Sequence, residues 1–72
     1  MKMMIVFDSK IYSESAIQAA IRAFEDIATI HMAFCGNDII CSVLASSYDQ
    51  ELTCFEFANA VLEYSVIMDG LK

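Results

Sequence analysis

The chain has 72 residues, 58% of them hydrophobic, and ten acidic against four basic residues give a formal net charge of −6 at pH 7. This length allows one domain at most (residues 1–72), and so small a domain is marginally stable alone and commonly gains stability by assembling. The acidic balance repels phosphate groups and anionic lipids, and no apolar run approaches the ~20 residues that cross a bilayer, so we expect no nucleic acid, no membrane and a cytoplasmic location.

The first third of the chain predicts a strand followed by a helix. The strand is expected from Met3 to Ile11, with Met3, Ile5 and Phe7 facing the core, because the alternate set of Met4, Val6 and Asp8 ends in a charge. Ser13 is the expected N-cap of the helix, since its hydroxyl can accept a free backbone N–H of the first turn. Apolar residues at three- and four-residue spacing then form one stripe: Ile17, Ala20, Ile21, Phe24, Ile27 and Ala28.

The middle of the chain predicts a β-hairpin whose turn lies within residues 36–38. Either Gly36-Asn37 or Asn37-Asp38 can form the central pair, and both choices leave the same residues on each face. One face is wholly apolar, and we expect it to lie against the helices: Ile30, Met32, Phe34, Ile39, Cys41 and Val43. The other face is mixed and polar enough for water, although Ile40 and Leu44 could also meet a partner.

The last third, Gln50 to Lys72, predicts one long helix with more apolar surface than a lone domain needs. A first stripe suits packing on the sheet: Cys54, Phe55, Ala58, Val61, Leu62, Ser65 and Met68. A second stripe lies on a neighbouring face: Phe57, Ala60, Tyr64, Ile67 and Leu71. This second stripe must be covered by the other helix or by another chain, or be left exposed. We expect an inter-chain contact, which makes these five residues the predicted partner interface of a homodimer or other homo-oligomer.

These elements predict an α+β fold in the order β-α-β-β-α. We expect a two-layer sandwich, with a three-stranded mixed sheet and both helices on one face. A helix between the first two strands suggests that they run parallel, with a right-handed crossover. The order of the strands within the sheet stays open.

Residues with reactive side chains are few, and we expect no catalytic, cofactor-binding or metal-binding site. His31 and Cys35 share a strand face but lie four residues apart, about 13 Å along a strand, which is too far for one metal ion or a nucleophile–base pair. Cys41 and Cys54 are expected to be buried and inert. Cys35 is expected to be the most exposed thiol, and a thiol-dependent redox protein using Cys35 and His31 is a minor alternative.

Two segments of the chain together resemble a known family. Residues 11–24, IYSESAIQAAIRAF, place a Tyr-Ser pair before an alanine-rich helix that ends in an aromatic residue, and residues 55–66, FEFANAVLEYSV, hold a Glu-Phe-x-Asn pattern followed by paired aliphatic residues. Both resemble HxsD, the small protein of the His-Xaa-Ser repeat system. The resemblance implies an accessory protein encoded beside radical S-adenosylmethionine enzymes that modify a repeat-bearing peptide. The residues that match the second motif are Glu56, Phe57, Asn59, Val61 and Leu62. The resemblance is carried over only to Tyr12, Ser13, Phe57 and Asn59, and capping and packing account for these four without a binding role.

The leading functional hypothesis is therefore a non-enzymatic accessory or binding protein that self-associates through its last helix. The alternative is a peptide-recognition module in which a sheet edge or a helix groove receives a precursor peptide. An open strand edge beside a groove lined by Met32, Phe34 or Phe55 would favour this alternative.

Overall fold

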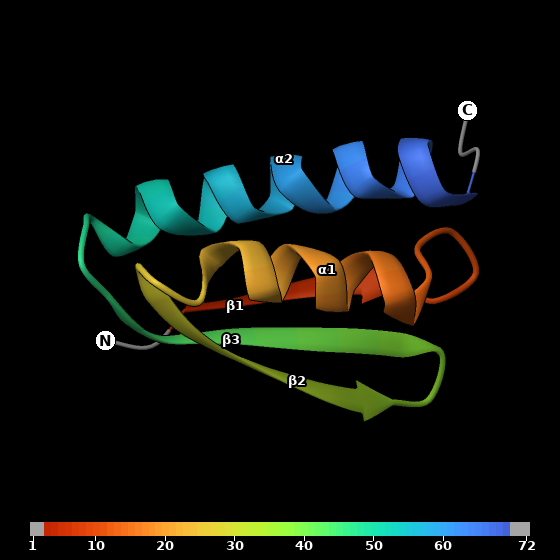
Figure 1. Ribbon diagram of the computed structural model, residues 1–72. Coiled ribbons are helices and arrows are strands. Elements are labelled where there is room, and N and C mark those ends of the chain that lie inside the picture. Colours follow the sequence, from red (N-terminus) through yellow and green to blue (C-terminus); the bar gives the residue numbers. More distant parts are fainter. Residues whose placement is uncertain (1–2, 70–72) are drawn as a thin grey trace.

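A computed structural model describes residues 3–69 of the chain (Figure 1). Its elements, in chain order, are β1 (Met3–Asp8), α1 (Glu14–Phe24), β2 (Ala28–Cys35), β3 (Asp38–Ser46) and α2 (Gln50–Asp69). Both helices lie on the same face of the three-stranded sheet, with α2 running almost its full length (Figure 1). The predicted α+β class, the element order and the two-layer arrangement are confirmed.

The strands are ordered β1-β3-β2, and β3 is antiparallel to both of its neighbours. β1 and β2 therefore run in the same direction, as expected from the helix between them, but β3 lies between them. The prediction of a mixed sheet is wrong in this respect, because no two parallel strands among the described residues are hydrogen-bonded neighbours. β3 is the central strand, and β1 and β2 form the two edges.

The strand and the helix at the start of the chain are both shorter than predicted. β1 ends at Asp8, whose carbonyl accepts hydrogen bonds from the backbone amides of Ile11 and Tyr12, and this turn takes the place of the expected last residues of the strand. α1 begins after Ser13, whose hydroxyl accepts a hydrogen bond from the amide of Ala16 at 3.1 Å, as predicted. The helix ends at Phe24, so Ala28, expected on its apolar stripe, instead begins β2.

The hairpin turn is formed by Gly36-Asn37, because Cys35 and Asp38 are paired directly across it. Gly36 has a φ of +61°, and no other described residue has a positive φ. Glycine as the first central residue is typical of the two-residue turns that suit strand twist. Of the hairpin face expected against the helices, Ile39, Cys41 and Val43 are buried, and Ile30 and Met32 pack on the core. Phe34, at the distal end of β2, is 60% exposed, contrary to expectation.

The core is centred on Phe57 of α2, which is fully buried. The rings of Phe7 and Phe24 both meet it edge-on, with centroids at 6.2 Å and 5.7 Å, and Tyr12 packs on Phe7 in the same way at 5.3 Å. Such edge-to-face contacts add to the stabilisation from burial itself. One aromatic cluster thus joins β1, α1 and α2. No helix in the described range is long and apolar enough to cross a membrane.

Candidate functional site

α2 is apolar on nearly every side, but its buried face differs from the predicted one. Phe57, Val61 and Ser65 are fully buried and Cys54 is nearly so. At 100° per residue these four positions fall within about 80° of arc, whereas Phe55 and Leu62 lie about 140–160° from Phe57. Phe55 and Leu62 are accordingly exposed, at 68% and 44%. The assignment of Phe55, Leu62 and Met68 to the sheet is therefore wrong, since all three are exposed.

The predicted partner interface is divided by the fold. Phe57 is in the core, and Ala60 and Tyr64 are partly buried and pack against that core. Ile67 is 77% exposed, and Leu71 lies outside the described residues. The placement of Phe57 at an inter-chain surface is wrong, because Phe57 is fully buried. α1 packs alongside α2, so α2 buries a second side in addition to the side that faces the sheet.

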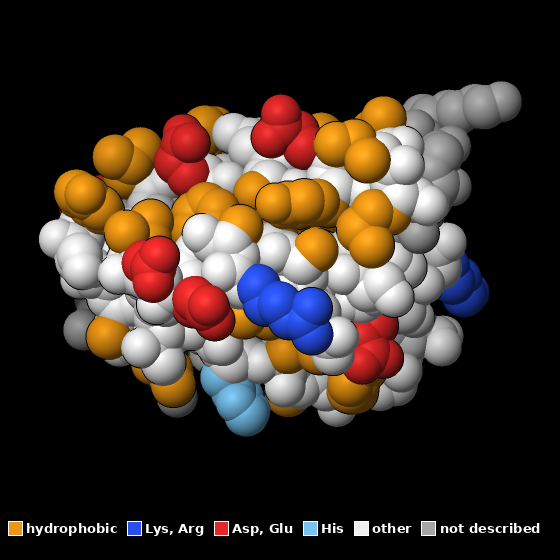
Figure 2. All heavy atoms as spheres, viewed as in Figure 1, with side chains coloured by type: hydrophobic (Ala, Val, Ile, Leu, Met, Phe, Trp, Pro, Cys, Tyr) orange, Lys and Arg blue, Asp and Glu red, His pale blue; other side chains and the backbone are white. Residues whose placement is uncertain are grey.

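The apolar excess of α2 is real, but it lies on the outward side of the helix. The exposed row consists of Leu52, Phe55, Leu62 and Val66, with Asn59 at the position between Phe55 and Leu62. Figure 2 shows hydrophobic side chains gathered along the α2 layer, interspersed with acidic ones. α2 contains no Lys or Arg. This side of the molecule is therefore both apolar and negative.

The free edge of β1 lies beneath the first half of α2. The amide of Ser9, just past β1, donates to the carbonyl of Asn37 at 2.9 Å, so odd-numbered residues of this strand turn their main-chain groups toward β3. By the alternation of an antiparallel ladder, the N–H and C=O groups of Met4 and Val6 turn toward the free edge. Two residues therefore offer donors and acceptors to an added strand.

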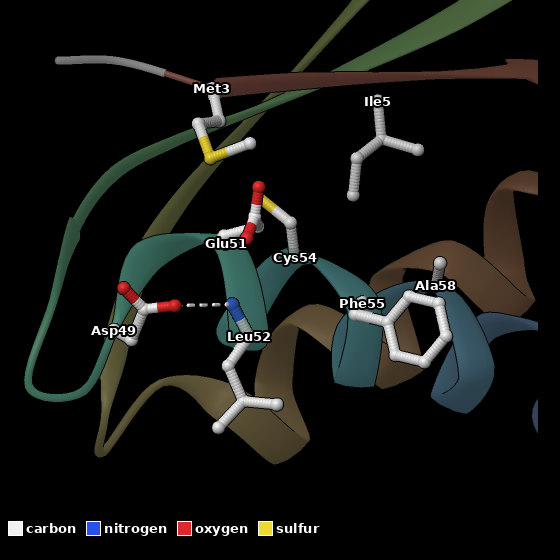
Figure 3. A pocket seen from close by; sticks show the side chains of 8 residues that line it. All are labelled: Met3, Ile5, Asp49, Glu51, Leu52, Cys54, Phe55 and Ala58. Carbon is white, nitrogen blue, oxygen red and sulfur yellow. Dashed lines mark hydrogen bonds between the residues drawn. The ribbon is translucent and has the colours of Figure 1, made fainter.

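A groove of about 700 Å³ runs between this strand and α2. Met3 and Ile5 point from β1 toward α2, and the side chains of Glu51 and Cys54 point from α2 back toward β1 (Figure 3). Leu52, Phe55 and Ala58 complete the apolar lining, and Asp49 stands at the same end as Glu51. The groove is thus mostly apolar, and its eight described lining residues include two carboxylates and no basic group.

The two carboxylates of the groove have different local roles. Asp49 precedes α2, and its carboxylate accepts a hydrogen bond from the amide of Leu52 at 3.0 Å, as a helix N-cap does (Figure 3). Glu51 lies in the first turn and faces Cys54. The pKa of the Cys54 thiol is raised, first because burial disfavours the thiolate and second because the negative charge of Glu51 is close. The Cys54 thiol is therefore uncharged at pH 7 and forms part of the apolar lining of the groove.

The other predicted reactive residues are not brought together. His31 pairs with Ser42 and Cys35 with Asp38 across the hairpin, and both His31 and Cys35 are exposed, as expected for the mixed face. Cys41 is fully buried, and burial raises the pKa of its thiol to about 11. Within residues 3–69, no three side chains of the metal-binding types gather closely enough to hold an ion.

Most of the residues carried over from the HxsD resemblance cap a helix or pack in the core. Ser13 caps α1, Tyr12 packs against Phe7, and Phe57 is the centre of the core. Asn59 is exposed on the outward row of α2. Three of the four therefore have packing or capping roles.

Most groove residues could not be recognised from the sequence as a site. The alternation in the strand predicts Met3 and Ile5 on the side that faces the helices, which is confirmed, and Phe55 is one of the residues expected to line a peptide groove. These residues form one open groove only because β1 is an edge strand, and the strand order alone decides this. The available signal was the surplus of apolar residues on α2, which indicated an uncovered surface without locating it.

A scan against models of protein families finds no match for this chain. Comparisons with curated proteins and with solved structures likewise find none with significant similarity. The functional reading of this site therefore depends on its geometry and chemistry.

Proposed function

We propose that this protein is a polypeptide-binding module in which the free edge of β1 and the adjoining groove receive an extended segment of a partner. The observation that supports this most directly is the coincidence of an unpaired strand edge with a mostly apolar groove of about 700 Å³. In strand addition, main-chain hydrogen bonds supply affinity and pockets for alternate side chains supply specificity. Both components lie side by side in this fold.

The position of the groove favours β1 over the other edge strand. An added strand would bond to the main-chain groups of Met4 and Val6, and every second side chain would then enter the groove beside Met3 and Ile5. β2 has a register shift between Thr29 and Ile30, where β3 carries an extra residue. A bulge of this kind bends the strand that carries it and increases the local twist, so the neighbouring β2 is a less regular template for an added strand.

An accessory role in peptide modification is a further part of this proposal. It rests on the resemblance of residues 11–24 and 55–66 to the HxsD family, whose systems include a repeat-bearing peptide. A module that holds an extended peptide for a partner enzyme is compatible with that role. We infer no catalytic residue in this chain from it.

The test is a titration of isotopically labelled protein with a blocked heptapeptide that alternates valine and threonine and has glutamine at both ends. We expect saturable shifts of the Met4 and Val6 amide resonances, with smaller changes along β2. Val6→Pro should abolish these shifts, because proline removes the outward N–H at an edge position that a sheet tolerates. Val6→Thr is the matched control, since it keeps the N–H and suits a strand.

Absence of saturable binding at millimolar peptide, or equal binding by the Val6→Pro and Val6→Thr variants, would remove the proposal. Shifts confined to β2 would move the site to the other edge and contradict it as well.

Self-association through α2 is a second candidate, supported by the exposed far end of this helix. Leu62, Val66 and Ile67 line a shallow hollow of about 380 Å³ together with Glu63. Sedimentation at micromolar concentration should then give a dimer that Ile67→Glu dissociates, since a charge at the centre of an apolar contact is costly. A monomer in both proteins would exclude this second candidate and leave the strand-addition proposal in place.

A further inference from the structure

The charges around the groove specify what kind of segment it accepts. We propose that the occupant is a basic strand, with a Lys or Arg on the same side as an apolar residue two positions away. This inference rests on the proposed function, because it names the partner of the same site.

The apolar part of the occupant follows from the lining. Met3 and Ile5 form one wall, and Phe55 and Ala58 form the other. A side chain placed opposite Ile5 on an added strand meets these apolar groups from both sides. A strand neighbour two residues along points into the same groove, because alternate side chains share one face.

The basic part follows from the end of the groove near Met3. Asp49 and Glu51 both line that end, and the Glu51 side chain points toward β1 (Figure 3). A side chain opposite Met3 therefore extends toward the Glu51 carboxylate, with the Asp49 carboxylate at the same end, and the described lining residues include no Lys or Arg that would neutralise them. A lysine or arginine there gains charge-assisted hydrogen bonds, whereas an acidic side chain is repelled.

The same charges disfavour a second copy of this chain as the occupant. The outward face of α2 carries Glu56 and Glu63 and no basic residue, and each chain has a net charge of −6. A second copy bound in this groove would bring its own negative charge close to the carboxylates of Asp49 and Glu51. The acidic outward face of α2 attracts a basic partner from a distance. The carboxylates of Asp49 and Glu51 at the end of the groove then bind its Lys or Arg.

The experiment compares three blocked heptapeptides that share a core of alternating valine and threonine. They carry lysine, glutamine or glutamate at both ends, placed on the valine side, so that either strand direction brings one end to the carboxylates. At low ionic strength we expect the lysine peptide to bind about tenfold tighter than the glutamate peptide, with the glutamine peptide between them, because each exposed ion pair contributes modestly. The difference should shrink at about 0.5 M NaCl as the charges are screened.

Two double variants separate local from global charge. Asp49→Asn with Glu51→Gln removes the groove carboxylates, and asparagine preserves the helix cap. Glu56→Gln with Glu63→Gln removes the same amount of charge from exposed positions of α2 that do not line the groove. We expect the first pair of substitutions to abolish most of the lysine preference and the second pair to retain most of it.

Equal binding of all three peptides would overturn the basic-strand proposal and leave the strand-addition function standing. An equal loss of the lysine preference in both double variants would also overturn it, since net charge alone would then explain the preference. If none of the three peptides binds, the proposed function itself fails.

Discussion

Phe57 is the residue at which the sheet and the two helices meet. It contacts the rings of Phe7 and Phe24 edge-on and is completely buried. Phe55, two positions earlier on the same helix, is 68% exposed. Two identical side chains thus have opposite environments, which gives a direct test of the helix orientation.

We expect Phe57→Ala to destabilise the fold by about 3–5 kcal/mol, because it leaves a cavity at the centre of the aromatic cluster. This loss approaches the total stability of a small domain, so the milder Phe57→Leu is the more informative variant in urea unfolding. Phe55→Leu is its matched control and should change the free energy of unfolding by less than about 0.5 kcal/mol. A larger effect at Phe55 than at Phe57 would mean that α2 is rotated from the orientation described.

Cys41 makes stability depend on pH in the alkaline range. Burial raises the pKa of its thiol from 9.0 to about 11, so the folded state binds a proton that the unfolded state has already released. The stabilisation is fully present below pH 9 and is lost as the pH rises from about 9 to 11. The raised thiol pKa of Cys54 acts in the same direction.

We therefore expect the free energy of unfolding to fall by about 2–3 kcal/mol at most across this range because of Cys41. Urea titrations at several pH values measure this slope, and Cys41→Ala is the control that should flatten it even though its own stability is lower. An unchanged slope in Cys41→Ala would assign the pH dependence to other groups.

At the scale of elements, the N-terminus of α1 is set by one side chain. Ser13 has an extended backbone and accepts the amide of Ala16, while Ser15 is exposed within the first turn. The helix has 11 residues, which is too few to be stable without its cap and its packing.

Ser13→Ala should lower the free energy of unfolding by about 0.5–2 kcal/mol, because a backbone N–H of the first turn loses its acceptor. Ser15→Ala is the matched control and should be neutral or slightly stabilising, since alanine has the higher helix propensity. Thermal unfolding followed by circular dichroism compares the two. An equal loss in both variants would argue against the cap.

At the scale of the whole molecule, the dominant feature is that apolar side chains remain exposed on two sides of the fold. The helices cover one face of the sheet, while Met4, Val6 and Leu44 are exposed on the opposite face and a row of α2 is exposed on the outside. The surface combines this apolar area with a net charge of −6. Like charges within a compact fold repel one another, and this repulsion lowers the stability of the folded state.

We expect added NaCl to stabilise the protein because it screens this repulsion. Raising the concentration from about 10 mM to about 150 mM shortens the screening length from about 30 Å to about 8 Å, which is less than the width of the molecule. Thermal unfolding in the two buffers should show a higher midpoint at the higher concentration. A lower midpoint would mean that attractive charge pairs outweigh the repulsion.

The sequence by itself determined the local structure of this protein. Alternation in β1, the Ser13 cap, the turn residues at 36–38 and the apolar spacing of both helices are short-range patterns with direct physical causes, and they predicted the element order and the α+β class. The choice of Gly36-Asn37 as the central pair of the turn came from the structure. They also predicted which hairpin residues face the helices, apart from Phe34. The apolar surplus of α2 was equally visible, because composition does not depend on orientation.

Only the tertiary structure decided which side of α2 is buried and which strand is an edge. A helix that is apolar all round contains no internal signal for its rotation, so the packing of α1 beside it placed Phe57 inside and Phe55 outside. The strand order is likewise set by long-range pairing, and it placed β3 in the centre and left β1 free beside Phe55 and Glu51. The candidate site exists because these two outcomes coincide, and no local pattern in the chain encodes that coincidence.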